Sequence, residues 1–382
     1  MTVSPRSPQI RPADPAAHAE MLRLLSGHFT RAEPRGRALA YVRALLADPT
    51  RASAAEIAAQ AGAVSAWSTQ RLLTRTVWDA DLLRDSVRAH VVRRLGTSAP
   101  CAVLCRHETV RAGTSAVAVT PAGTRTAGRE RNTQTAALLC YVSRGVGALV
   151  DRELHLPPQW TSDPARCARA GVPPERVRSR NMADLGQEML EGALAASVPI
   201  GWVFGGPDFA DPQLRQWLCL RRLPFCVELP QLPGQPVPSE PQAPRADPGQ
   251  KESWQLLSRG LGTFGRPAPG FGLTLLARRQ PSGQISRFLL HASLSAPGIP
   301  AARAMAAAGP AAARAIHEAD TRAGLSSHQV RSWVAWYRHT TLAMTAAALR
   351  LETTPSAMGP GTPDPKEPAG PDPSARELSP RA

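Results

Sequence analysis

The sequence predicts an α/β protein in which a helical region precedes a larger region of alternating strands and helices. Before residue 96, apolar residues recur at helical spacing, as in the series Leu39, Val42 and Leu46. After residue 96, short runs rich in β-branched and aromatic residues alternate with helical patterns. The chain has 382 residues, of which 43% are hydrophobic, and this is enough to build the cores of such an arrangement.

The N-terminal region divides into a disordered start and a helical domain. Residues 1–16 are rich in Pro, Ser and Arg, so we expect them to be disordered. We assign 17–96 to a helical domain that is a candidate for DNA binding. The segment 54–73 is similar to a helix-turn-helix with one extra residue in its turn, although a plain helical hairpin is the preferred interpretation. A further helix is predicted over 78–95, and Gly96 ends it.

The second region, residues 97–350, is predicted to alternate between strands and helices. Strands are expected at 102–105, 116–120, 135–142, 200–204, 225–229, 273–277 and 286–291. Helices are expected at 182–196, 212–222, 301–322 and 326–351. Closely spaced prolines near 230–249 predict a linker or an exposed insertion, and the Pro/Gly/Ser-rich tail at 351–382 is expected to be disordered.

The charge of the chain indicates a polyanionic partner. The net charge is +15, and nearly all the positive charge is arginine. Nucleic acid is the leading candidate, because phosphate neutralisation supplies most non-specific affinity. A biased nucleotide composition of the gene is the alternative explanation for the many arginines. That bias accounts for the ratio of arginine to lysine, but not for the excess of basic residues over acidic ones.

The cysteines and the hydropathy pattern indicate a cytoplasmic protein. The chain has six cysteines without CxxC spacing, which predicts buried, reduced thiols rather than zinc ligands or disulfides. No basic and then apolar leader opens the chain, and the uncharged run at 192–207 is broken by proline and glycine. We therefore expect no membrane association.

One stretch, residues 101–119, organises the functional interpretation. It begins as an apolar strand, reaches a polar group at Arg106-His107-Glu108-Thr109 and turns at Gly113 into a second strand. A carboxylate at the end of such a strand would mark a catalytic site. The sequence carries His107 there instead.

Several short segments of the chain match segments of a known family and occur in the same order. They are 29–35, 70–73, 78–81, 108–109, 128–134, 150–157, 163–166, 201–203, 211–215 and 324–344. The last is the most specific, with Val330-Arg331-Ser332-Trp333 and Trp336-Tyr337-Arg338-His339. Together, from about residue 22 to residue 350, these segments resemble the insertion-sequence 701-type DDE transposases. The resemblance implies a ribonuclease H-like core that cuts and joins DNA with three carboxylates and two Mg²⁺ ions.

The resemblance also assigns the three acid positions of that family, and none of them carries an acid here. They fall on His107, Gly206 and Ala313. The nearest acids are Glu108, Asp208 and Glu318. Side chains alternate along a strand, so Glu108 should point away from the site that His107 faces.

Three hypotheses follow. The first is a degenerate, transposase-derived protein that binds double-stranded DNA and no longer cuts or joins it. Under this hypothesis we expect no cofactor. The second is an active transposase that uses Glu108, Asp208 and Glu318 as displaced Mg²⁺ ligands. The third is a new activity with His107 as a base or a transition-metal ligand beside Glu108. The candidate DNA contacts are Arg71, Arg331, Arg338 and His339, and the oligomeric state stays open.

Overall fold

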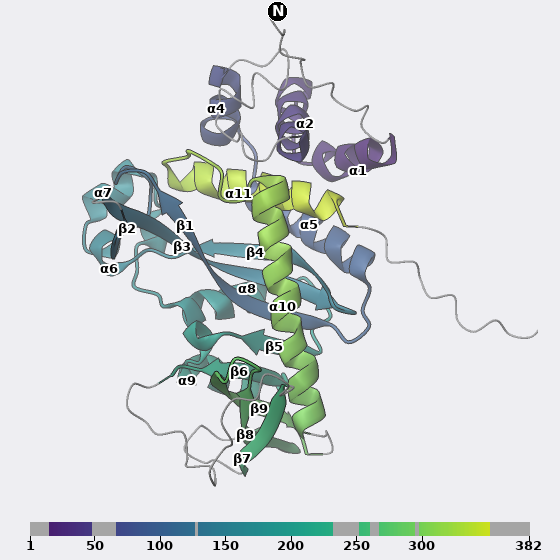
Figure 1. The fold of residues 1–382 in the computed structure, drawn as a ribbon. Coiled ribbons are helices and arrows are strands. Elements are labelled where there is room, and N and C mark those ends of the chain that lie inside the picture. The colour runs from purple at the N-terminus through teal and green to yellow at the C-terminus, as the bar shows by residue number, and fades with distance from the viewer. Residues whose placement is uncertain are drawn as a thin grey trace, which may run out of the picture. The chain divides into compact units, whose positions relative to one another are not determined.

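A mixed β-sheet of nine strands lies at the centre of the described part of the chain (Figure 1). This computed structural model describes residues 15–47, 66–126, 129–231, 252–259, 267–294 and 298–351. All of these residues belong to one unit that ends at Leu351. The predictions for 1–14, 54–65, 232–249 and 352–382 therefore lie outside the described residues, whereas residues 15 and 16, expected to be disordered, begin a helix.

The centre of the sheet has the strand order β4-β3-β1-β5-β6. In it, β1 (Cys101–Arg111), β3 (Arg129–Ser143) and β4 (Val146–Leu154) are antiparallel neighbours. The other two strands, β5 (Trp202–Gly205) and β6 (Phe225–Leu229), run parallel to β1. Three antiparallel strands followed by two parallel ones are typical of a ribonuclease H-like DDE core, and this order confirms the predicted fold class.

Further strands extend this centre on both sides. The strand β2 (Val119–Thr126) pairs with the first half of β3. Beyond β6 the sheet continues, antiparallel, through β9 (Ile285–Ser293), β8 (Phe271–Arg279) and β7 (Ser253–Arg259). The segment between β6 and the next long helix thus adds three strands to the sheet. Of these three, only β7 is missing from the sequence-based prediction.

The N-terminal helices pack against a helix from the other end of the described chain. They are α1 (Pro15–Ser26), α2 (Ala32–Ala47), α4 (Ala66–Thr74) and α5 (Ala80–Leu95). All four contact α11 (Trp333–Leu349), and the Tyr41 hydroxyl of α2 lies 2.7 Å from Nδ1 of His339. Both regions share one hydrophobic cluster, so the domain boundary at residues 96 and 97 stays a prediction.

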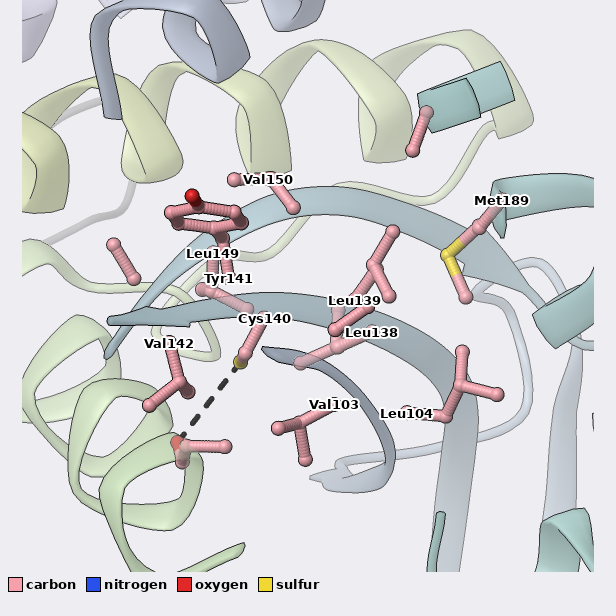
Figure 2. Close-up of a cluster of buried hydrophobic side chains, with 14 of the residues drawn as sticks. Val103, Leu104, Leu138, Leu139, Cys140, Tyr141, Val142, Leu149, Val150 and Met189 are labelled. Carbon is pink, nitrogen blue, oxygen red and sulfur yellow. Dashed lines mark hydrogen bonds between the residues drawn. The ribbon is translucent and has the colours of Figure 1, made fainter. Parts of the chain in front are cut away.

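Two long helices cover opposite faces of β1 and β3. On one face, Gly186 of α8 (Met182–Ala195) lies close to Leu104. On the other, the Cys140 thiol points to the backbone oxygen of Ala312 in α10 (Gly298–Ala323), 4.0 Å away (Figure 2). Shorter elements complete the chain: α6 (Pro158–Thr161), α7 (Pro164–Arg169), η1 (Pro174–Arg176), η2 (Pro207–Phe209) and α9 (Pro212–Leu220).

Capping side chains set two helix starts that apolar periodicity places too early. Asp79 accepts hydrogen bonds from the backbone of Asp81 and Leu82, so α5 begins at Ala80 and not at residue 78. Ser332 caps α11, which therefore begins at Trp333 and not at residue 326. The six residues before Ser332 form a connection that reaches the strand β1, as described below.

The strand β4 is missing from the sequence-based prediction because its charged residues look like those of an exposed loop. They are buried and paired instead. Asp151 accepts hydrogen bonds from Arg84, at 2.6 Å, and from Arg88 of α5. Arg152 is fully buried and donates to Asp81 at 2.8 Å, and Glu153 accepts from the Tyr337 hydroxyl at 2.8 Å. Ion pairing thus allows a polar run to form a buried strand at the edge of the sheet.

The six cysteines are free thiols, and all except the half-buried Cys105 are buried. Burial raises the pKa of the Cys101 thiol to about 12, which makes it a poor nucleophile. None of the described helices is both long and apolar enough to span a lipid bilayer.

Two glycines of α8 provide a test of this packing. A Cβ at Gly186 would lie 3.0 Å from Leu104 and 3.1 Å from Phe209, whereas a Cβ at Gly192 meets nothing within 4 Å. We expect Gly192→Ala to raise the free energy of unfolding by about 0.5–1 kcal/mol through helix propensity. Gly186→Ala should instead lower it by about 1 kcal/mol or more through overpacking. Urea unfolding of both variants measures the difference, and equal effects would contradict the close contact of α8 with β1.

Candidate functional site

The C-terminal half of β1 presents two different faces. From Cys105 to Arg111 its residues alternate between half-buried and exposed. His107 belongs to the half-buried set on the face that α10 covers. Glu108 is exposed and, because the side-chain period of a strand is two, points to the opposite face. Glu108 therefore does not replace an acid at His107.

His107 belongs to a chain of polar contacts that joins β1 to α10. Its Nε2 lies 2.8 Å from the Ser326 hydroxyl, which donates to Oδ1 of Asp320 at 2.6 Å. Burial lowers the pKa of His107, although Asp320 opposes this effect. His107 is thus neutral near pH 7, and its Nε2–H donates to Ser326.

Arg111 holds the connection between α10 and α11 against β1. Its guanidinium donates to the backbone oxygens of Ser326 and His328 at 3.2 and 2.7 Å, and to Nε2 of His328. It also donates to Oε1 of Gln134 at 3.0 Å. Burial lowers the pKa of Arg111 to about 10, so the group stays charged near pH 7. The positive charge of Arg111 thus lies four residues from His107 on the same face.

The pocket beside His107 is small. It has room for about one water molecule, and its polar lining comes from His107, Thr109, Gln134, His328 and Thr340. None of the side chains that line this pocket is a carboxylate, the oxygen ligand by which Mg²⁺ is usually bound.

The second acid position lies at the end of β5. Gly206 follows the strand directly, and a Cβ there would meet nothing within 4 Å. The position therefore has room for a side chain. Asp208 lies two residues further on, and its Oδ1 is 3.3 Å from Nη1 of Arg106. Arg106 also pairs with Glu108, so one guanidinium lies between the two acids.

The third acid position falls on α10. Ala313 and Glu318 are both exposed, whereas Asp320 faces β1, with Oδ1 3.7 Å from Nε2 of His107. Residues two positions apart in a helix are separated by about 200° around its axis, so Glu318 and Asp320 cannot share a face. The structure brings Glu108 and Asp208 together on Arg106 and does not bring Glu318 to them. Across the described residues, no three His, Cys, Asp or Glu side chains gather as a metal site.

The sequence holds a signal that points to Asp320. Along α10 the buried residues Ala312, Ala319 and Ala323 mark the face that packs on the sheet. Asp320 lies eight residues after Ala312 and one after Ala319, which places it on the edge of this face. Helical spacing therefore favours Asp320 over Glu318 as the acid next to β1.

The four candidate DNA contacts divide into two pairs. Arg71 and Arg331 are exposed. Arg338 donates to the backbone oxygens of Leu73 and Trp78, at 3.2 and 2.9 Å. His339 is fully buried and lies 3.0 Å from the backbone oxygen of Gly324. This packing excludes His339 as a DNA contact and gives Arg338 an internal role.

Comparisons with known proteins place these observations in a family. The profile described as DDE superfamily endonuclease matches residues 24–255. Among solved structures, the chain is similar to the piggyBac transposase in its cryo-EM synaptic complex with hairpin DNA, at 11% identity and a TM-score of 0.44. That match covers 87% of this chain and 70% of the piggyBac chain. No curated protein matches the chain.

The buried histidines predict a loss of stability in acid. Burial lowers the pKa of His339 to about 4 and that of His328 well below its usual value. An unfolded histidine has a pKa near 6.5, so between these values the unfolded state binds more protons. The stabilisation is therefore complete above about pH 6.5 and is lost as the pH falls towards 4. For His339 we expect about 2 kcal/mol to be lost between pH 7.5 and pH 5.

Denaturant unfolding at several pH values measures this loss. His339→Gln should flatten the dependence between pH 5 and pH 7.5, and the exposed His317 on α10 offers the matched control, His317→Gln. A free energy of unfolding that is equal at pH 5 and pH 7.5 in the unsubstituted protein would contradict the burial of these histidines.

Proposed function

Because this chain belongs to the DDE superfamily endonuclease family, we propose that it is a transposase-derived protein that binds duplex DNA and does not cut or join it. One observation carries the catalytic half of this proposal. The three places where family acids are expected, on β1, directly after β5 and on α10, hold His107, Gly206 and Ala313.

The residues present do not fit the two Mg²⁺ ions of the parent family. Mg²⁺ is a hard cation that takes oxygen ligands in octahedral geometry, and two ions need several carboxylates. Beside His107 there is one carboxylate, Asp320, and it already accepts the hydrogen bond of Ser326. The neutral imidazole of His107 is a poor ligand for Mg²⁺, and the positive charge of Arg111 on the same face opposes cation binding.

The acids on the opposite face of β1 also lack the means to hold a metal. Glu108 and Asp208 are both paired with Arg106, whose guanidinium supplies the positive charge that a metal ion would otherwise bring. Glu318 lies exposed on α10, which covers the other face. These contacts disfavour the alternative of an active enzyme with displaced acids.

The charge of the chain supports the DNA-binding half of the proposal. A net charge of +15 favours association with a polyanion whatever its sequence. Arg71 and Arg331 are exposed on the part of the molecule where α4 and α11 meet, so both are available to phosphates. The partner that fits this charge is duplex DNA.

A plasmid assay tests the catalytic half. Supercoiled DNA incubated with the protein and either Mg²⁺ or Mn²⁺ should stay supercoiled, because the described residues bring no set of carboxylates together to activate water. Asp208→Ala and Asp320→Ala, assayed in parallel, should look the same as the unsubstituted protein. Metal-dependent nicking that either substitution abolishes would overturn the proposal and support displaced acids.

A salt titration tests the DNA-binding half. If about six phosphates are contacted, the affinity for duplex DNA should fall about a thousandfold between 50 and 200 mM salt, because counterions are released on binding. Fluorescence anisotropy with a labelled duplex measures this dependence. Absent binding at 50 mM salt, or binding that does not change with salt, would remove this half of the proposal.

A further inference from the structure

We propose that the exposed face of α4 enters the major groove of duplex DNA, with Gln70 and Arg71 at base edges and Arg75 at a phosphate. This inference rests on the proposed DNA-binding function and deepens it, because it assigns the groove, the helix and the base-reading side chains.

The exposed residues of α4 lie on one stripe. They are Trp67, Gln70, Arg71, Thr74 and, just after the helix, Arg75. Their spacing of i, i+3, i+4, i+7 and i+8 places them on one side of a helix. Leu72 and Leu73, on the other side, are buried in the core. The helix therefore presents a continuous polar and aromatic face to solvent.

The C-terminal end of α4 is held in place by backbone contacts that do not involve its exposed face. The indole nitrogen of Trp78 donates to the backbone oxygen of Leu72 at 2.9 Å. The Arg338 guanidinium donates to the backbone oxygen of Leu73 at 3.2 Å and lies 5.2 Å from the centre of the Trp78 ring. These contacts fix the helix on α11, so an outward face of α4 is presented on a rigid support.

The chemistry of the stripe fits base edges and phosphates. Arginine reads guanine and glutamine reads adenine through paired hydrogen bonds in the major groove, which is wide enough to admit an α-helix. The Arg71 guanidinium lies 5.1 Å from the centre of the Trp67 ring, a stacking contact that orients it before binding. Trp67 is 63% exposed, so its ring and the Arg71 guanidinium are both accessible to a nucleic acid.

The charge of the stripe favours DNA over a protein partner. From residue 66 to residue 78 the chain has two arginines, Arg71 and Arg75, and no acid. A stripe with only positive charge repels a second copy of itself, whereas it complements the phosphate backbone on either side of a groove.

Binding-site selection from a random duplex library, followed by anisotropy on the selected duplex and on a scrambled one, tests this inference. Gln70→Ala and Arg71→Ala should each reduce the preference for the selected duplex by about 5- to 150-fold. Arg75→Ala should weaken both duplexes alike and reduce the salt slope by about one. Arg303→Ala, on the exposed side of α10, is the control for loss of one positive charge and should leave the preference unchanged.

The outcomes separate this inference from the proposed function. No binding of any duplex by the unsubstituted protein would overturn both. The unsubstituted protein could instead prefer the selected duplex, with Gln70→Ala and Arg71→Ala changing that preference no more than Arg303→Ala does. This result would overturn only the role of α4. A dimer in light scattering that Trp67→Ala dissociates, with DNA affinity unchanged, would also overturn it. Circular dichroism of each variant checks that the fold is retained. A further variant, Gln70→Glu, keeps the size of the side chain but adds a negative charge, and it should weaken DNA binding more than Gln70→Ala does.

Discussion

The alternation of side chains along β1 is the constraint on which the rest of the site depends. It places His107, Thr109 and Arg111 on the face covered by α10 and by the connection that follows it, and Arg106 and Glu108 on the other. Each face then satisfies its own polar groups: the first through Ser326, Asp320 and His328, the second through the ion pairs of Arg106. An acid that is displaced by one residue along the strand is thus moved to the wrong side of the sheet.

The residues that carry the family resemblance mostly serve packing. Asp151, Arg152 and Glu153 on β4 tie the sheet to α5 and α11 through buried ion pairs and hydrogen bonds. His339 joins α11 to Tyr41 of α2, and Arg338 holds the end of α4. Removing one partner of a buried charged pair is costly, by about 3–5 kcal/mol. Stability alone is therefore a reason for such residues to persist, whether or not the protein cuts DNA.

Much of the fold could be predicted from the sequence, because apolar periodicity and turn residues mark most strands and helices directly. The strand β6 has the predicted bounds, Phe225–Leu229, since a short, mostly apolar run lies between Pro224 and Pro230. The strand β4 could not be predicted in this way, because partners of Asp151 and Arg152 come from α5, far away in the chain. The start of α11 depends on a single cap, Ser332, and periodicity does not detect it.

The site was harder to predict than the fold. Sequence spacing identifies His107 as the residue of interest on β1, and strand alternation explains why Glu108 is no substitute. The role of Asp320 depends on the rotation of α10 against the sheet, which alignment to a family motif at Ala313 does not provide. The position of His339 off the expected apolar stripe predicts an accessible side chain. The helix α11 is instead covered by α2, α5 and the sheet, so nearly its whole circumference is buried.

We infer that the core of this protein retains the scaffold of a DDE endonuclease but has no place for metal ions. A crystal structure of the protein with duplex DNA, grown in MnCl₂ and measured at a wavelength where manganese scatters anomalously, tests it most directly. We expect DNA in the complex and no anomalous peak near His107, Gly206 or Asp320. A manganese ion coordinated by Asp320 or Asp208 beside a DNA phosphate would contradict it.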